Sequence, residues 1–282
     1  MITSVAIVGC GWFGTPLAKF LLDKNLKVFG SKRTPQGADA LSEDGIHGFA
    51  LDLDDTCAFN DSTSQSEQLN KTQQALWQDA LIVNIPPGLR SGKSDYLERL
   101  QKLKTLIGDH QYQRVVFVST TGVYAADGRC HDETSASAYD DKSQTLLAAE
   151  QLFLDYSCCT VLRFAGLVGP KRAPGRFFAG KRDIAGANLS VNMTHLDDCI
   201  GATYQVLQAQ HSANNIFNVC AEQHPTKQAF YFAATQKLGL PAPAFAVDND
   251  ASLDKTVCGQ KIVNELNYRY HYLDPMVMLE HC

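Results

Sequence analysis

A turn rich in glycine occupies residues 9–14, between two segments of contrasting pattern. Residues 5–8 are continuously apolar and predict a buried strand, whereas residues 13–23 have the apolar spacing of a helix. Between a strand and a helix, the spacing Gly-x-Gly-x-x-Gly permits a tight turn and lets a phosphate approach the backbone. The start of the helix adds N–H groups that attract anions. The turn therefore predicts a dinucleotide site whose cofactor-binding residues include Gly9, Gly11, Trp12, Phe13 and Gly14.

Three polar residues follow the second predicted strand, residues 26–29, and bear on which dinucleotide is preferred. Sites that select NAD place an acidic residue here to bind the ribose 2′-hydroxyl. This chain has Ser31, Lys32 and Arg33 instead. A hydroxyl and two cations suit a 2′-phosphate, so we predict NADP in preference to NAD. The alternative is that both cations are solvated and that NAD binds.

A hydroxyl and two proton donors follow the predicted strand at residues 115–119. At the carboxyl end of a central strand, a side chain points into the cleft where ligands bind. Thr120 is therefore predicted to hydrogen-bond a substrate oxygen, although a local bond to the backbone is the alternative. A proton donor is also required for carbonyl chemistry. Lys142 and Tyr124 are the candidates, against the alternatives of a surface lysine and a packed ring.

Three further residues are candidates for substrate binding. Arg163 ends the predicted strand at residues 160–164, and Arg176 lies in a basic stretch broken by Pro and Gly, residues 171–182. We interpret this stretch as a substrate lid whose cations would suit an anionic substrate. His195 precedes two aspartates at a predicted helix start. The alternatives are a structural ion pair for Arg163, a solvated loop for Arg176 and a local hydrogen bond for His195.

Short apolar runs alternate with amphipathic segments through the first half of the chain, a pattern that predicts a parallel sheet covered by helices. We expect a doubly wound α/β Rossmann fold, with a dinucleotide-binding domain at residues 1–165 and a smaller mixed α/β substrate region at 166–282. Residues 216–219 and the nearby helix are candidates to return to the first domain. Predicted strands are 5–8, 26–29, 49–53, 81–85, 115–119, 160–164, 189–193 and 216–219; predicted helices are 13–23, 64–76, 96–107, 143–156, 197–208 and 226–238.

The composition excludes several classes of protein. The 282 residues are 45% hydrophobic and 20% charged, with a formal net charge of −5 and no basic run, which argues against nucleic-acid binding. No apolar run is long enough to span a bilayer or to form a signal peptide, so we expect no membrane contact and a cytoplasmic location. Nine cysteines without Cys-x-x-Cys spacing argue against a disulfide framework and a zinc site. We therefore predict no metal.

Several motifs together resemble the extended short-chain dehydrogenase/reductases (SDRs), and more narrowly their atypical YeeZ-like branch, which is related to NAD-dependent epimerases and dehydratases. The resemblance covers almost the whole chain and rests on motifs that are specific only in combination. Besides the glycine turn, they are Asp52-Leu53, Ser119-Thr120-Thr121-Gly122-Val123-Tyr124, Asp132-Glu133, Leu147-Ala148-Ala149-Glu150, the segment 163–170, His195-Leu196-Asp197-Asp198 and Ile216-Phe217-Asn218-Val219.

The resemblance implies further roles for residues after the third and fourth strands. Asp52 and Leu53 would flank the adenine, with a turn or cap as the alternative for Asp52. Asn84, Ile85 and Pro86 would line the ribose on the nicotinamide side. A homodimer is implied by family analogy.

One family feature is missing. Typical members carry a Tyr and a Lys four residues apart on one helix, so that the cation lowers the Tyr pKa for proton exchange. Counted from Glu150, these positions hold Lys142 and Leu146, and the nearby Tyr139 stands three residues before Lys142. We therefore hold two functions open: an NADP-dependent oxidoreductase or epimerase/dehydratase acting on a small polar carbonyl or sugar-nucleotide-like substrate, and a protein that binds NADP(H) as a sensor.

Overall fold

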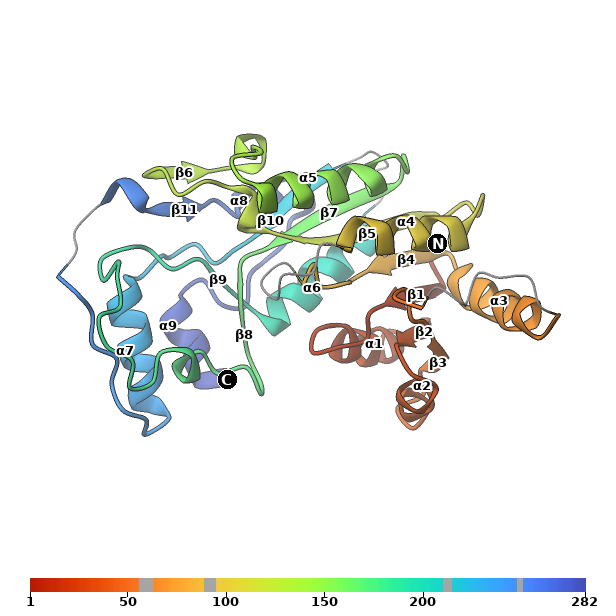
Figure 1. The fold of residues 1–282 in the computed structure, drawn as a ribbon, viewed down its shortest axis with the longest axis horizontal. Coiled ribbons are helices and arrows are strands. Elements are labelled where there is room, and N and C mark those ends of the chain that lie inside the picture. Colours follow the sequence, from red (N-terminus) through yellow and green to blue (C-terminus); the bar gives the residue numbers. More distant parts are fainter. Residues whose placement is uncertain (56–62, 89–94, 210–214, 248–250) are drawn as a thin grey trace. The chain divides into compact units, whose positions relative to one another are not determined.

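The computed structural model describes residues 1–55, 63–88, 95–209, 215–247 and 251–282 (Figure 1). Their contacts define two compact units, and the chain passes between them more than once. The predicted functional boundary at residue 165 stays a prediction. The first unit contains Met1–Ser119, Thr145–Val161 and Thr203–Asn215; the second contains Thr120–Gln144, Leu162–Ala202 and Ile216–Cys282.

A seven-stranded sheet forms the centre of the fold, in the order β10-β7-β5-β4-β1-β2-β3. The pairings of β1 with β2 and β4, of β2 with β3 and of β4 with β5 are parallel. From β1 the chain first adds strands on one side of the sheet (β2, β3) and then on the other (β4, β5, β7, β10). This order is that of a doubly wound Rossmann sheet, which confirms the predicted fold. The strands are β1 (Ser4–Val8), β2 (Lys27–Lys32), β3 (His47–Ala50), β4 (Ala80–Val83), β5 (Arg114–Thr120), β7 (Cys159–Phe164) and β10 (Asn215–Val219).

Helices connect these strands, because parallel neighbours cannot be joined by tight hairpins. Five of the connecting helices were predicted, with ends that differ by a few residues. The helices are α1 (Gly14–Asp23), α2 (Pro35–Ser42), α3 (Thr63–Leu76), α4 (Tyr96–Ile107), α5 (Asp141–Leu154) and α6 (Leu196–Gln208).

The structure corrects the prediction between β2 and β4. Helix α2 was not predicted, although Thr34 caps it by accepting a hydrogen bond from the Gly37 N–H at 3.2 Å and Pro35 occupies its first turn. Strand β3 was predicted to end at residue 53, but it ends at Ala50. The chain then turns where the Asp52 carboxylate accepts the Asp54 N–H at 3.0 Å, because such Asx turns compete with strand pairing.

The core of the first unit is built from the strands that were read as continuously apolar. Ile7, Leu81 and Val116 are completely buried in β1, β4 and β5. Leu17 and Leu21 on one face of α1 are also completely buried. Burial of both sheet faces is typical of parallel strands covered by helices.

The second unit contains two short parallel ribbons, which the sequence analysis did not predict. One pairs β6 (Arg129–His131) with β11 (Lys255–Val257), and the other pairs β8 (Gly166–Val168) with β9 (Met193–His195). The expected strand at 189–193 is therefore wrong in its position, since only its last residue lies in β9. The remaining helices of this unit are α7 (Lys227–Lys237), α8 (Gln260–Leu266) and α9 (Pro275–Met278).

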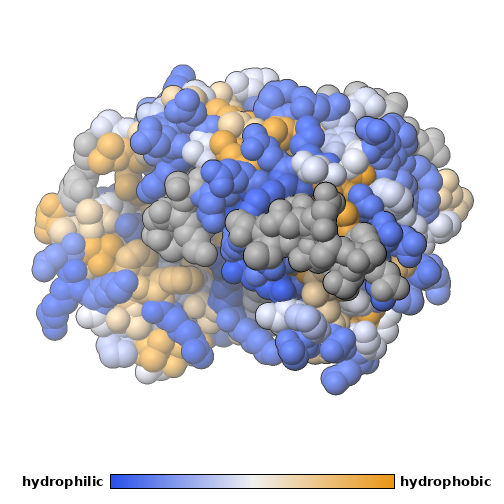
Figure 2. All heavy atoms as spheres, turned by 45° about the vertical axis from the view of Figure 1, so that its right-hand side comes forward, coloured by the Kyte–Doolittle hydropathy of each residue, from blue (hydrophilic) through white to orange (hydrophobic). Residues whose placement is uncertain are grey.

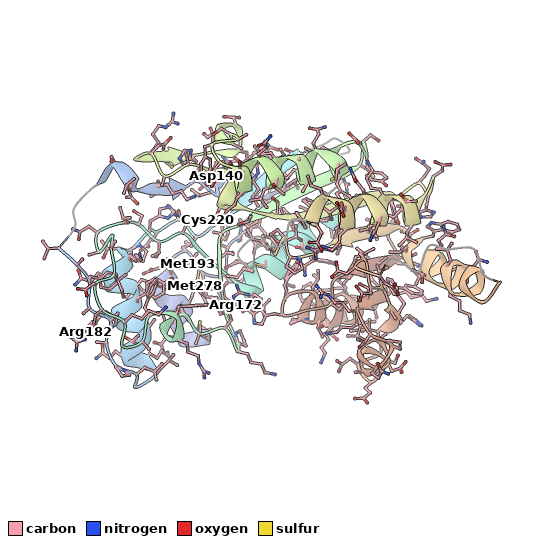
Figure 3. The ribbon with its side chains drawn as sticks, viewed as in Figure 1. Asp140, Arg172, Arg182, Met193, Cys220 and Met278 are labelled. Carbon is pink, nitrogen blue, oxygen red and sulfur yellow. The ribbon has the colours of Figure 1, made fainter. Side chains whose placement is uncertain are left out.

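A separate apolar cluster stabilises the second unit. Met193 of β9 and Met278 of α9, both labelled in Figure 3, belong to it together with Phe230 of α7. The surface is more mixed: Figure 2 shows hydrophilic residues spread widely over the face in view, with smaller hydrophobic areas between them. Within the described parts of the chain, no helix has the length and apolar character needed to cross a bilayer.

Candidate dinucleotide site and the hydroxyl turn

The glycine turn has the geometry that its spacing predicts. Gly9 has a φ of +105°, and a Cβ there would lie 2.2 Å from the backbone oxygen of Asn84. A Cβ on Gly14 would lie 2.3 Å from the Gly9 oxygen. Neither position tolerates a larger residue without movement of the backbone. By contrast, a Cβ on Gly11 would meet no described atom within 4 Å, so the second glycine borders open space.

Two side chains from neighbouring strands brace this turn. The Gly9 N–H donates to the Ser31 hydroxyl oxygen at 3.0 Å, and the Asn84 amide nitrogen donates to the Gly9 carbonyl at 3.0 Å. Thr15 on α1 adds a hydroxyl bond of 2.9 Å to the Cys10 carbonyl. Ser31 is 3% exposed, which places its hydroxyl beneath the turn rather than at the surface. The turn is therefore fixed before any ligand arrives.

The N-terminus of α1 suits an external anion. The N-cap residue is Phe13, whose side chain has no group able to accept a helix N–H, and the first turn of the helix carries no acidic residue. Uncompensated helix N-termini carry a partial positive charge. Phe13 itself is 4% exposed and anchors the helix, while Trp12 is half-buried.

The two cations after β2 differ in their surroundings. Lys32 is half-buried. Burial raises the pKa of the Cys10 thiol to about 12, and the positive charge of Lys32 opposes this rise. The Lys32 ammonium therefore lies near the glycine turn. Arg33 is exposed, and its guanidinium lies 3.8 Å from the Asp54 carboxylate. An exposed pair of this length contributes little stability and leaves the guanidinium available to a phosphate.

The residues that the resemblance assigned to the adenine and the ribose lie on two loops of the first unit, after β3 and after β4. Asp52 is exposed and forms the turn described above, which was its alternative role. Leu53 is 6% exposed, and its carbonyl accepts a hydrogen bond from the Lys102 ammonium at 3.0 Å. Ile85 is half-buried and Pro86 is exposed, so both offer surface to a ligand.

A hydroxyl turn at the end of β5 belongs to the second unit. The Thr120 hydroxyl accepts the Gly122 N–H at 3.3 Å, and the Tyr139 hydroxyl donates to the Gly122 carbonyl at 3.0 Å. Thr120 thus makes the local bond that was its alternative role, while remaining half-exposed. Lys142 is exposed near the start of α5, whereas Leu146 is 6% exposed on the same helix.

Tyr124 and Arg163 form a buried network. The Arg163 guanidinium donates to the Tyr124 hydroxyl at 2.8 Å and to the Glu133 carbonyl at 3.0 Å. The Tyr124 hydroxyl donates to the Asn218 side-chain oxygen at 2.7 Å. Tyr124 is 0% exposed and Arg163 2%, and burial raises the pKa of the tyrosine above its usual value. Both side chains are therefore engaged in a buried network, and the catalytic role of Tyr124 and the substrate-binding role of Arg163 stay predictions.

His195 and Arg176 lie in contrasting environments. His195 is 1% exposed; its Nδ1 accepts the Asp197 N–H at 3.2 Å, and its Nε2 lies 3.1 Å from the His281 carbonyl. Both ring nitrogens face backbone groups, but only the bond from Asp197 to Nδ1 is the local bond that was the alternative to substrate binding. Arg176 is exposed on a single 3₁₀ turn, Pro174–Phe177. In Figure 3, Arg172 and Arg182, near the two ends of the expected lid, lie well apart.

The sheet order and the glycine turn define a Rossmann-fold protein. No protein-family model matches the chain. Over 279 residues it is 38% identical to the protein YeeZ of Escherichia coli K12, which covers 97% of this chain and 98% of YeeZ. The chain belongs to the YeeZ family.

Two solved structures share the fold. A conserved protein of unknown function from Silicibacter pomeroyi has a TM-score of 0.76 at 22% identity, covering 99% of this chain and 97% of its own. A UDP-glucose-4-epimerase from Stenotrophomonas maltophila, solved with NAD and formylated UDP-arabinopyranose, has a TM-score of 0.76 at 16% identity, with coverage of 99% and 96%. At these identities the likeness concerns the fold alone.

The sequence analysis missed the partners that position the predicted residues. Ser31 and Asn84 were expected to contact the ligand, yet both hold the glycine turn. Tyr139 was noticed only as a near-miss of the Tyr-Lys spacing, although it fixes the turn beside Thr120. Such braces could be found by looking for a polar residue at the end of each strand that neighbours the strand before the glycine turn, as Ser31 and Asn84 do here. No group of three or more His, Cys, Asp or Glu side chains within the described ranges is arranged to hold a metal ion.

Proposed function

We propose that this protein binds NADP(H) on the glycine turn and acts as an oxidoreductase or an epimerase/dehydratase on a small polar carbonyl or sugar-nucleotide-like substrate. The observation that carries the proposal is the rigid turn with one open position. Gly9 and Gly14 are closed in by backbone, whereas Gly11 borders space at the start of an uncapped helix. Such a cradle fits a pyrophosphate.

The first unit supplies the groups that would hold the dinucleotide. The backbone at Gly11, Trp12 and Phe13 would accept the pyrophosphate. Lys32 and Arg33 would pair with the 2′-phosphate, which is the basis of the preference for NADP. Ile85 and Pro86 would contact the nicotinamide-side ribose. When bound, the nicotinamide supplies hydride transfer.

The second unit supplies the groups that would act on the substrate. The half-exposed Thr120 hydroxyl has its oxygen engaged by the Gly122 N–H, which leaves its proton for a substrate oxygen. Lys142 is the exposed proton donor that remains once Tyr124 is assigned to the buried network. Arg176 would meet an anionic group of the substrate. Support for this substrate class comes from the solved epimerase that carries NAD together with a sugar nucleotide.

A titration and a substrate screen test the proposal together. The purified protein is titrated with NADPH and NADH by nicotinamide fluorescence, and carbonyl compounds and UDP-sugars are then screened by absorbance at about 340 nm. We expect tighter binding of NADPH and turnover of at least one compound. Thr120→Ala should lower turnover about 100-fold, while Thr120→Ser should restore most of it. Unchanged turnover in Thr120→Ala would refute the catalytic assignment.

A second function, sensing of NADP(H), is favoured by one observation. The helix position that carries the family lysine holds Leu146, which is 6% exposed and unable to act on a phenol or a ribose by charge. Loss of a general acid or base costs about 10² to 10⁴ in rate. Tight NADPH binding without turnover of any screened compound would support the sensor over the enzyme.

A further inference from the structure

A pocket of about 470 Å³ lies entirely within the second unit. Its size is within the range of small-molecule sites. The β6–β11 ribbon, helix α8 and the segment after β10 contribute its walls. None of the cofactor or catalytic residues assigned above is among the described residues that line it. The pocket is therefore separate from the proposed function and can be tested independently.

Three cysteines distant in the sequence meet in the walls of this pocket. Cys130 of β6 is exposed, Cys258 is half-buried, and Cys220 is buried; all are free thiols. The strand register places Thr256 opposite Cys130, and the Cys258 N–H donates to the His131 carbonyl at 2.9 Å. In Figure 3, Cys220 lies beside the end of β10. Together with Val257 and Val263, the thiols make much of the lining apolar and polarisable.

His224 adds a directional polar group to the lining. Its Nδ1 is buried and has no hydrogen-bond partner within the described part of the chain. Burial lowers the pKa of the His224 ring, and a hydrogen bond with the Val191 backbone opposes this shift. The His224 ring therefore adds a polar residue to the pocket wall.

Two exposed charges of opposite sign also line the pocket. Arg269 offers a guanidinium, which pairs with carboxylates in a forked geometry. Glu222 offers a carboxylate, which pairs with an ammonium group. A ligand that carries only one sign would face one favourable and one unfavourable partner. Both charges are satisfied together by a molecule that has an ammonium and a carboxylate beside an apolar body.

We propose that this pocket binds a small zwitterion, a free amino acid with an apolar or aromatic side chain. The carboxylate lies on Arg269, the ammonium lies on Glu222, and the side chain enters between the thiols and valines. Each partner is a group whose present surroundings leave it able to bind one more ligand atom.

Calorimetry with three related probes tests the charge requirement. L-Phenylalanine carries both charges, 3-phenylpropionate lacks the ammonium and phenethylamine lacks the carboxylate. We expect L-phenylalanine to bind at least about tenfold more tightly than either analogue, as the loss of one charged hydrogen bond implies. Arg269→Gln should remove the preference over phenethylamine, and Glu222→Gln should remove the preference over 3-phenylpropionate. The exposed controls Arg182→Gln and Glu98→Gln should keep both preferences. Equal binding of all three probes, or binding of none, would overturn the proposal.

Thiol protection locates the ligand without relying on any activity. L-Phenylalanine should slow the alkylation of Cys130 and Cys258 by iodoacetamide, measured by peptide mass spectrometry. Cys158 and Cys282 are also partly accessible but lie outside the pocket, so their rates should not change. Val263→Trp should fill the pocket and abolish protection, with an unchanged melting temperature as the check on folding. Protection of all four cysteines alike, or of neither pocket cysteine, would contradict this location.

Discussion

The glycine turn of the first unit and the Tyr124–Arg163 network of the second unit use polar groups in opposite ways. In the turn, side chains brace the backbone from behind and leave open space at Gly11. In the network, the phenol, the guanidinium and their partners bond to one another, and both side chains are almost fully buried. A polar cluster is therefore a candidate ligand site when its bonds leave a face unfilled, and a structural element when they close on themselves.

The largest effect that tests this comparison is expected at Gly9. In Gly9→Ala, the new Cβ would lie 2.2 Å from the Asn84 oxygen at a φ of +105°. Overpacking and backbone strain together should lower the free energy of unfolding by about 3 kcal/mol or more. Urea denaturation measures this loss. Wild-type stability in Gly9→Ala would show that the turn is not rigid.

A large loss of stability is also expected from breaking the buried network. Arg163→Met removes the guanidinium that donates to the Tyr124 hydroxyl and to the Glu133 carbonyl. Both buried oxygens then lose this hydrogen bond. The free energy of unfolding should fall by about 3 kcal/mol, since breaking a buried charged network is costly. The NADPH dissociation constant, measured at a temperature where the variant is folded, should stay within about twofold. A selective loss of substrate turnover with full stability would instead return Arg163 to the active site.

A smaller effect is expected from removing one brace of the turn. In Asn84→Ala, the Gly9 carbonyl loses a hydrogen bond of 3.0 Å. The free energy of unfolding should fall by about 1 kcal/mol, the usual net value of one hydrogen bond. NADPH binding should weaken severalfold because the turn is less well fixed, as titration by fluorescence would measure. If NADPH affinity falls 100-fold with unchanged stability, Asn84 contacts the ligand directly.

The smallest effect on stability, and a specific effect on cofactor choice, is expected at the two cations after β2. The double variant Lys32→Gln, Arg33→Gln removes both charges while leaving the buried Ser31 in place. The ratio of NADH to NADPH dissociation constants should fall at least about 100-fold, because the variant removes two charged bonds to a phosphate and each is worth about 1.5 to 3 kcal/mol. Lys19→Gln, an exposed lysine elsewhere in the first unit, is the control. An unchanged ratio would remove the argument for NADP.

The features that could be predicted from sequence are those that depend on a few consecutive residues. The apolar runs that became β1, β4 and β5 and the glycine turn each depend on a short window, in which backbone geometry dictates residue type. A structural role was considered for Arg163, but its partners could not be predicted, because Tyr124 and Glu133 lie 39 and 30 positions away along the chain. The thiol-lined pocket could not be predicted either, because Cys130 and Cys258 are brought together only by the pairing of two three-residue strands.

Helix α2 and the end of β3 illustrate a different limit. Both depend on short polar residues, Thr34 and Asp52, whose side chains bond to the backbone two or three residues later. Such residues were considered as ligand contacts or were passed over, although their local bonds decide where the elements begin and end.

The most direct test of the account is calorimetric titration of NADPH into the wild-type protein and into Gly11→Leu. Gly11 borders open space, so a leucine there should leave the melting temperature unchanged while occupying the place of the pyrophosphate. The account predicts saturable heat for the wild type and a loss of affinity of at least about 100-fold for Gly11→Leu. It is contradicted if the wild type gives no heat and no thermal protection with NADPH or NADH, or if Gly11→Leu binds as tightly as the wild type.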